Sequence, residues 1–479
     1  MSWLTRKDVV PSPKNGEIIT RRRGRAQEVF VKGCGQTTDY TNAMWTGAFE
    51  RLAVRPVRPA VLMLGLGGGG GVSLLYEYFP GCTITAVEYD PVMIKLAREA
   101  LTQQAVTLPT IMEMDAALVF SHIAEKFDVI IVDLFDGPEP SLLSKDTTYL
   151  RALQAHLNPS GVVLLNVYKN KEYLEAASGI FGWSDVWTYK ENHLGAFRTT
   201  AVGFTPPDAW KEYGMVALPA PLCRRENVEG GTRWCLWPLC FELYTSDTEP
   251  NIASNAHGAL AYNRIVLWKR VARTDVPAGW HAPMRPRPWR TDGFFELQSG
   301  VDYTELWHKK ARHDVRRWRE DAAAGKYRVE PLSFGQFAES YKKSTAYKKA
   351  GSHLLEIFER KWALPETRAQ LVLWGVRDVV ANKIIAGMAV HYPPSQSASV
   401  RECPFMLKEA TSSHAMTGVM DYWFAESQRR GVMYQVFTYF WQRGDSRQWK
   451  GFSVFKSHFV QQYVVYPPLL WRFVRDKFW

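Results

Sequence analysis

The stretch VLMLGLGGGGG, residues 61–71, decides the fold of this chain. An apolar run that suits a buried strand leads into a loop almost without side chains, and residues 72–79 (VSLLYEYF) then predict a helix. Glycines let the backbone turn sharply and approach a ligand closely, while the start of a helix offers free N–H groups and positive potential. A second β-rich run ends at Glu88, about 20 positions after the glycines, where a carboxylate can bind a ribose diol. We therefore expect a ligand site where this strand meets its helix.

Strand and helix patterns alternate after this stretch. We predict helices at residues 91–104, through 119–123 and at 144–157, and strands at residues 82–87, 110–114, 129–132 and 161–167. This alternation, with nearly continuous apolar strands, predicts an α/β fold with a mostly parallel, doubly wound sheet covered on both faces. Ligands of such sheets bind beyond the carboxyl ends of the strands, where Gly67, Glu88, Asp115 and Asp133 fall.

Length and texture predict more than one domain. A chain of 479 residues is too long for one compact core. We divide it into an N-terminal segment with a strand at 28–32 and a helix at 39–50, a ligand-binding domain, a Pro- and Gly-rich linker that begins the second domain, and a C-terminal α/β domain. Their expected bounds are residues 1–55, 56–205, 206–289 and 290–479. Asp39 is the expected N-cap of the 39–50 helix.

Composition restricts the class of protein. The net charge of +11 suits anionic partners such as coenzyme phosphates or nucleic acid without selecting one of them. Six cysteines lie scattered along the chain, so we expect neither disulfides nor a metal site. No segment approaches 18 uninterrupted apolar residues, and the N-terminus lacks the apolar core of a signal peptide. We expect a cytoplasmic protein without a membrane span.

The motifs of residues 28–205 resemble the class I S-adenosylmethionine-dependent fold and, within it, the spermidine synthase (polyamine aminopropyltransferase) family. The resemblance rests on the 61–88 stretch, on Asp115 and on the DLFDGP motif at residues 133–138. It implies that Gly65, Gly67, Gly68 and Gly69 bind the cofactor, with the 67–71 backbone against its methionine part, that Glu88 binds the ribose and that Asp115 binds the adenine amine. Asp133 and Asp136 are the implied catalytic pair, which holds an amine and accepts its proton. Tyr40, in a segment similar to the helix before the glycine strand of the family, is the expected substrate-binding residue.

The glycine loop departs from the family at one position. Aminopropyltransferases place an aspartate in this loop to bind the amine of decarboxylated S-adenosylmethionine, and Gly68 stands there in this chain. Three functions therefore stay open. The first is transfer of an aminopropyl or related alkyl group to an amine. The second is N-methylation by S-adenosylmethionine, whose carboxylate suits bare backbone N–H groups. The third is a catalytically inactive nucleotide-binding scaffold.

Residues 290–479 resemble the GNAT-like acyltransferases of the Fem type. The resemblance rests on a basic amphipathic helix within residues 303–324, predicted strands at 369–376, 384–392 and 432–439, a helix at 416–429, and the GFSVFKSHF segment at 451–459. It implies an N-acyltransferase that uses acyl-CoA or another activated acyl donor, with an aminoacyl-tRNA as one form of that donor. His414, Gly418 and Lys456 are the residues we expect at the acyl donor. Together the domains predict a bifunctional transferase that acts on a small amine or amino acid, and we allow for a homodimer.

Overall fold

The chain forms two compact units, Met1–Phe204 and Thr205–Trp479. We call them the N-terminal unit and the C-terminal unit. The computed structural model describes residues 6–23, 26–200, 224–228, 231–236, 239–245, 249–250, 263–270, 276–283, 288–350, 353–394, 397–442 and 445–475.

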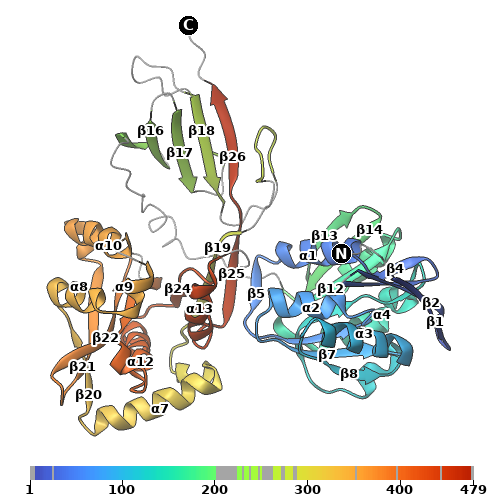
Figure 1. The fold of residues 1–479 in the computed structure, drawn as a ribbon, viewed down its shortest axis with the longest axis horizontal. Helices are drawn as coiled ribbons and strands as arrows, with labels where there is room; N and C mark the ends of the chain where they lie inside the picture. The colour runs from blue at the N-terminus through green and yellow to red at the C-terminus, as the bar shows by residue number, and fades with distance from the viewer. Residues whose placement is uncertain are drawn as a thin grey trace. The chain divides into compact units, whose positions relative to one another are not determined.

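A seven-stranded sheet forms the centre of the N-terminal unit (Figure 1). In spatial order its strands are β13 (Trp183–Tyr189), β14 (Asn192–Arg198), β12 (Leu157–Tyr168), β9 (Phe127–Val132), β6 (Ala60–Leu64), β7 (Thr83–Glu88) and β8 (Thr110–Glu113). All pairs from β8 to β12 are parallel, which confirms the predicted mostly parallel sheet. β13 and β14 add an antiparallel edge that the sequence analysis does not predict.

Alternate side chains of the strands fill two cores. Val61 and Met63 of β6 pack on one face of the sheet, while Leu62 and Leu64 pack on the other. The first face is covered by α1 (Asp39–Arg51), α2 (Gly70–Tyr78) and α3 (Pro91–Gln103), and the second by η1 (Ala116–Ser121), α4 (Thr147–Ala155) and α5 (Glu172–Ser178). The predicted helix through residues 119–123 is thus a short 3-10 helix. The sheet is doubly wound, as predicted.

The strand order reverses beside the glycine loop. From β6 the chain builds outward through β7 and β8, and then returns to place β9 and β12 on the other side of β6. At such a reversal, the loops after adjacent strands leave in opposite directions and open a crevice at the carboxyl ends. The loops after β6 and β9 therefore border the place where a ligand of this fold binds.

A second sheet precedes the central one. Strands β1 (Arg6–Ser12), β2 (Gly16–Arg23), β3 (Ala26–Val31) and β4 (Cys34–Thr37) form a four-stranded antiparallel sheet, whereas the sequence predicts one strand here. Its Ile18, Val29 and Val31 pack against α3. A short strand, β5 (Val54–Pro56), follows α1. The N-cap of α1 is Thr38 instead of Asp39, because Thr38 and Thr41 form a reciprocal capping box.

The C-terminal unit contains two sheets. One has the order β15 (Arg224–Val228), β16 (Gly231–Leu236), β17 (Leu239–Thr245), β18 (Asn263–Lys269) and β26 (Leu470–Arg475). The other includes β20 (Tyr327–Pro331), β21 (Leu371–Asp378), β22 (Lys383–His391), β23 (Ala398–Met406), β24 (Tyr434–Phe437), β19 (Pro288–Glu296) and β25 (Gln462–Pro468), in that order. Because β26 pairs with β18, the end of the chain shares a sheet with the segment we expected to be a linker.

Helices of the C-terminal unit lie mainly between β19 and β25 in the sequence (Figure 1). They are η3 (Tyr303–Leu306), α7 (Lys309–Ala323), α8 (Phe334–Lys342), α9 (Thr345–Ala350), α10 (His353–Ala363), α11 (Pro365–Arg368), η4 (Lys408–Ala410), α12 (Ala415–Arg429), η5 (Arg447–Trp449) and α13 (Lys450–Lys456). The predicted basic helix begins at Lys309, later than expected. Among the described residues, no helix is both long and apolar enough to cross a membrane.

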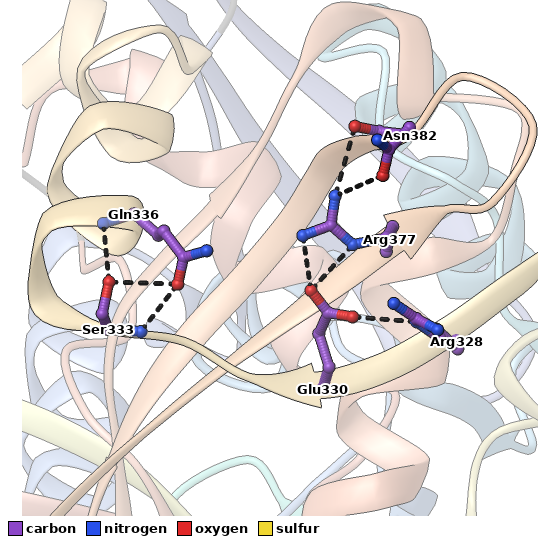
Figure 2. Close-up of polar contacts among 6 residues, drawn as sticks. All are labelled: Arg328, Glu330, Ser333, Gln336, Arg377 and Asn382. Carbon is purple, nitrogen blue, oxygen red and sulfur yellow. Dashed lines mark hydrogen bonds and ion pairs between the residues drawn. The ribbon is translucent and has the colours of Figure 1, made fainter.

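A polar cluster joins β20 and β21, the first two strands of the larger sheet of the C-terminal unit (Figure 2). The Glu330 carboxylate accepts hydrogen bonds from Arg328 Nε at 2.9 Å and from Arg377 Nε at 2.8 Å. Arg377 also donates to the side chain of Asn382 at 3.0 Å, in the turn after β21. Ser333 and Gln336 form the capping box that begins α8. These contacts fix the edge strand β20 to β21 and set the direction of α8.

Candidate active site

Two adjacent clefts open at the carboxyl ends of the central strands of the N-terminal unit. The larger, which we call the Glu88 cleft, contains about 530 Å³ of empty space, some of it open to solvent. Its lining includes Asn15, Gln36, Gly65, Glu88, Tyr89, Met93, Met114, Asp133 and Phe135. The smaller, the Trp45 cleft, contains about 360 Å³ and is lined by residues that include Gln36, Thr37, Thr41, Asn42, Trp45, Gly65, Gly67 and Asp133. Gln36, Gly65, Gly67 and Asp133 line both clefts and therefore form their shared boundary.

The glycine loop needs glycine for backbone reasons. Gly65 has a φ of +91°, and a Cβ atom there would lie 2.2 Å from the backbone oxygen of Asp133. Gly69 has a φ of +86° and is the N-cap of α2. No residue with a side chain fits position 65, because both its conformation and its neighbour forbid one. The loop thus brings bare backbone to the wall of both clefts.

Gly68 is enclosed by the N-terminal sheet. A Cβ atom at this position would lie 2.6 Å from Val29 Cγ2 and 2.9 Å from Thr37 Oγ1. The backbone N–H of Gly68 donates to Thr37 Oγ1 at 2.8 Å. The space of a side chain at position 68 is therefore already filled by residues of β3 and β4.

Glu88 lines its cleft and joins the loop after β6 to the segment that follows β7. Its carboxylate accepts hydrogen bonds from the N–H groups of Leu66, Tyr89 and Asp90, at 3.2, 3.0 and 3.1 Å. Burial raises the pKa of Glu88, and these donors oppose the rise. A carboxylate with two oxygens keeps acceptor capacity beyond three hydrogen bonds, so Glu88 is equipped to accept from a diol.

Asp115 lies beside the Glu88 cleft but its side chain serves the backbone. Asp115 Oδ1 accepts the N–H of Ala117 at 2.9 Å and thereby begins η1. Its chain neighbours Met114 and Ala116 line the cleft, while Asp115 itself is exposed. Asp115 is therefore close enough to border a ligand of this cleft, and its second carboxylate oxygen has no intrahelical role.

The Asp133 carboxylate, which belongs to a residue lining both clefts, is held by a side-chain donor on each oxygen. Asp133 follows β9, and its side chain is half-buried. Oδ1 accepts a hydrogen bond from Asn166 Nδ2 at 2.8 Å, and Oδ2 accepts one from Trp45 Nε1 at 3.0 Å. Burial raises the pKa of Asp133, while both hydrogen bonds oppose that rise. Two donors fix the carboxylate plane and leave lone pairs on both oxygens for a ligand.

Asp136 lies between Phe135 and Gly137, which both line the Glu88 cleft, but its own side chain points to solvent. It ends the short strand β10 (Phe135–Asp136), which pairs with β11 (Glu139–Pro140). Its carboxylate lies 2.5 Å from Lys32 Nζ, and the Asp136 side chain is 74% exposed. Asp136 is absent from the described lining of both clefts. The two aspartates expected to act as a pair therefore occupy different environments.

Tyr40 is not among the described residues that line the two clefts. Its hydroxyl donates to Asn192 Oδ1 at 2.6 Å, and Asn192 Nδ2 donates to Asn166 Oδ1 at 2.9 Å. The sequence analysis missed Trp45, Asn166 and Asn192. One signal for Asn166 was present, because it is a lone amide within the apolar strand VVLLNV, where a buried polar side chain needs a partner.

The residues expected at an acyl donor in the C-terminal unit separate into two places. His414 is the N-cap of α12, with a φ of +54°, and its Nδ1 lies 3.4 Å from Asp314. Gly418 lies inside the same helix, and a Cβ atom there would be 2.0 Å from the Trp318 ring. Gly418 therefore permits close packing of α12 on α7, and its N–H donates to the His414 carbonyl within the helix.

Lys456 lies in a buried cluster of charges at the end of β24. Its Nζ donates to the carbonyls of Thr438 and Tyr439 at 2.7 and 2.5 Å. Burial lowers the pKa of Lys456 to about 7, with Arg401 acting in the same direction and Asp292 against it. Arg401 is also buried, and its Nε has no hydrogen-bond partner among the described residues. This cluster carries more positive than negative charge.

Residues 53–178 match the family model of the spermine/spermidine synthase domain. A probable polyamine aminopropyl transferase of Bifidobacterium longum is 33% identical over 141 residues, which cover 29% of this chain and 30% of that protein. An eEF1A lysine and N-terminal methyltransferase homolog of Drosophila melanogaster is 32% identical over 131 residues, which cover 25% and 19%. The spermine synthase of Saccharomyces cerevisiae is 27% identical over 175 residues, which cover 33% and 58%.

The chain thus contains a spermidine synthase-type domain that is similar to transferases of two kinds, aminopropyltransferases and methyltransferases. It spans about a third or less of the length of the first two relatives and more than half of the third.

Proposed function

We propose that the N-terminal unit transfers an alkyl group from an S-adenosylmethionine-type sulfonium donor to an amine nitrogen. The observation that carries the proposal is the placement of Asp133, whose carboxylate lies on the boundary between the Glu88 and Trp45 clefts. A carboxylate with two fixed donors and open lone pairs attracts an ammonium group and can accept its proton. The match to the spermine/spermidine synthase domain supports the same chemistry.

The Glu88 cleft fits the nucleoside part of such a donor. Glu88 would accept hydrogen bonds from the ribose hydroxyls, and Asp115, at the cleft border, would face the base. Bare backbone at Gly65 and Gly67 allows close approach of the sulfonium end. When bound, the donor would supply an electrophilic carbon on its sulfonium sulfur; the carbon–nitrogen bond forms as the carbon–sulfur bond breaks, and a neutral thioether is the leaving group. The protein's own contribution is to hold both reactants in register and to keep a proton acceptor, Asp133, next to the attacking nitrogen.

The surroundings of Gly68 favour S-adenosylmethionine, and hence methyl transfer, over its decarboxylated form. The decarboxylated donor ends in an ammonium group with no carboxylate of its own beside it, so a carboxylate at the loop would have to bind that group. Position 68 offers neither a carboxylate nor the room for one. Among the described residues that line the two clefts, the carboxylates are those of Glu88 and Asp133. Aminopropyl transfer remains the first alternative, since one relative above is named a probable polyamine aminopropyl transferase and another a spermine synthase.

Calorimetric titration of the full chain with S-adenosylmethionine and with its decarboxylated form tests both points. We expect binding of a sulfonium donor and preference for the carboxylated one. Tight, selective binding of the decarboxylated form would contradict methyl transfer and support aminopropyl transfer. Binding of neither form would favour an inactive scaffold.

Replacing Asp133 tests the role of the carboxylate. Asp133→Asn should retain donor affinity within about threefold and lose at least about 100-fold in transfer to polyamine acceptors, because a general base contributes on that order. Transfer is followed by mass spectrometry of putrescine and spermidine incubated with the bound donor. Asp185→Asn, whose carboxylate pairs with Arg51 at the far end of β13, is the matched control and should keep full transfer. Equal transfer by Asp133→Asn and wild type would exclude Asp133 as the base.

We also propose that the C-terminal unit is a GNAT-like N-acyltransferase. The observation that favours it is the parallel pair β23–β24, which ends at the register Arg401↔Phe437 while β23 continues to Met406. The helix α12 connects β23 to β24 in the sequence. The buried Arg401 and Lys456 lie where the pairing of these two strands ends. An orphaned guanidinium nitrogen and an excess of positive charge suit an anionic acyl donor such as acyl-CoA.

Titration with coenzyme A and acetyl-CoA tests the second proposal. We expect saturable binding by the full chain, and a loss of about tenfold or more in affinity for Arg401→Met, because one charge-assisted contact is removed. Arg328→Met, at the exposed end of β20, is the control of equal charge change. Equal affinities of the two variants would remove Arg401 from the donor site, and absence of binding would remove coenzyme A as the donor.

A further inference from the structure

We propose that Tyr40, Asn192 and Asn166 form a directional hydrogen-bond chain that positions Asp133 and holds it as an acceptor toward the amine. This inference rests on the proposed function of the N-terminal unit, and it assigns a role to three residues outside the clefts. It replaces the expected role of Tyr40, since its hydroxyl is engaged with Asn192 and does not line the substrate space.

The chain is continuous and crosses three elements. Tyr40, at the start of α1, donates to Asn192 of β14 at 2.6 Å. Asn192 donates to Asn166 of β12 at 2.9 Å, and both amides are buried, with 7% and 3% of their surfaces exposed. Asn166 donates to Asp133 at 2.8 Å. Each link has the length of a good hydrogen bond.

The polarity of this chain is determined from both ends. An ionised Asp133 accepts only, so Asn166 must present its NH₂ group to Asp133 and its oxygen to Asn192. Asn192 must then present its NH₂ group to Asn166 and its oxygen to Tyr40, which is left to act as a donor. Tyr40 suits that role because burial raises the pKa of its phenol, so the hydroxyl stays protonated. The reversed chain would set the oxygen of Asn166 against the carboxylate.

The other oxygen of Asp133 is fixed independently. Trp45 Nε1 can only donate, and it reaches Asp133 Oδ2 at 3.0 Å from α1. Tyr40 and Trp45 lie on the same helix, so α1 supplies both the start of the chain and the second donor. With one donor on each oxygen, both oxygens keep a lone pair that can accept from a ligand in the clefts that Asp133 lines. The chemical class that satisfies them is a hydrogen-bond donor with positive charge, such as a primary or secondary ammonium group.

Breaking a link of this chain should change the pKa and the orientation of the Asp133 carboxylate, and the change should be larger the closer the link is to Asp133. Removing Asn166 deletes a donor to the charged carboxylate directly. Removing Asn192 or Tyr40 frees the next amide to rotate, so that its oxygen can face the carboxylate part of the time. We therefore expect the titration midpoint of Asp133 to rise in the order Tyr40→Phe, Asn192→Ala, Asn166→Ala, with a shift of about one pH unit for the last.

The experiment measures this midpoint by ¹³C NMR of carboxyl-labelled aspartate in the full chain, with the Asp133 signal identified by its absence in Asp133→Asn. Transfer is measured in parallel as kcat and KM for the acceptor across pH. The acid limb of kcat/KM should move with the NMR midpoint, and kcat at low pH should fall up to about tenfold in Asn166→Ala. Tyr168→Phe is the matched control, because its hydroxyl bonds the exposed Glu191 outside the chain.

Two results overturn the proposal: an unchanged Asp133 midpoint in Asn166→Ala and Asn192→Ala, or an equal shift in Tyr168→Phe. If Asn166→Ala fails to fold, Tyr40→Phe still decides, because it removes one hydroxyl from a half-buried side chain. The NMR midpoint needs neither donor nor acceptor. A protein that shows the graded midpoints but no donor binding would support the chain and refute the alkyl-transfer function.

Discussion

Both units contain a parallel strand followed by a loop and a helix, and the two loops use glycine differently. In the N-terminal unit, β6 leads through Gly65, Gly67 and Gly69, all with positive φ, into α2, and bare backbone lines two clefts. In the C-terminal unit, β23 leads into α12, and Gly418 lies inside the helix against Trp318. The comparison teaches that the glycines before the helix, with left-handed φ, bring backbone to the clefts, whereas the glycine within the helix permits close packing.

The charge of the two regions also differs in sign. The carboxylates of Glu88 and Asp133 border the clefts of the N-terminal unit. In the C-terminal unit the buried groups around β24 are Arg290, Asp292, Arg401 and Lys456. Burial disfavours the charged form of every such group, so it raises the pKa of the carboxylates and lowers that of Lys456 and Arg401. The described charges of the two regions thus differ in sign, as the two proposed ligands require.

The largest expected effect is that of Gly65→Ala. The added methyl group would meet the Asp133 backbone at 2.2 Å, and a φ of +91° is strained for alanine, so backbone must move. We expect a loss of roughly 2–5 kcal/mol in the free energy of unfolding, together with loss of donor binding. Urea denaturation and calorimetry measure both.

Gly47→Ala is the control for this substitution. Position 47 is in α1 with no atom within 4 Å of the added Cβ, so alanine should stabilise by about 0.5–1 kcal/mol. A Gly65→Ala protein that binds the donor normally would contradict the role we assign to the loop.

The next effect is that of Gly418→Ala. Its methyl group would overlap the Trp318 ring, but the backbone has ordinary helical angles, so only packed side chains and helices need to shift. We expect a loss of about 1–3 kcal/mol from the C-terminal unit and none in donor binding by the N-terminal unit. Hydrogen exchange of α7 and α12 localises the change.

Gly335→Ala, in α8 with open space around it, should not destabilise. A Gly418→Ala protein of full stability that no longer binds coenzyme A would instead assign this glycine to a ligand.

The central sheet, its doubly wound order and the loop at residues 65–71 could be predicted because their signals are local: apolar runs, glycines and a carboxylate at a strand end. The environment of Asp133 could not, because Trp45 and Asn166 reach it from two separate elements and Asn192 bonds Asn166 from a third. Position within a strand-end motif did not distinguish Asp133 from Asp136, since the difference comes from Lys32 in the turn between β3 and β4. The four-stranded N-terminal sheet depends on pairing between strands and has no strong periodic signal of its own.

The last effect, which tests the difference in charge, is the pH dependence due to Lys456. Its pKa is about 7 in the folded protein and near 10.4 in an unfolded chain, so between these values the unfolded state binds more protons. The free energy of unfolding then rises with pH, by at most about 1.4 kcal/mol per pH unit from this group, and the gain is lost as pH falls through 7.

Lys456→Met should reduce the rise in the thermal unfolding midpoint between pH 7 and pH 9, while Lys310→Met on the exposed face of α7 should preserve it. Arg401 contributes in the same direction, and the raised pKa of Asp133 has the opposite sign, with stability lost as pH rises through its window. If Lys456→Met leaves the pH profile unchanged, Lys456 is charged in the folded state. The cluster at β24 would then already contain enough negative charge to balance it, and an anionic acyl donor would not be needed for that.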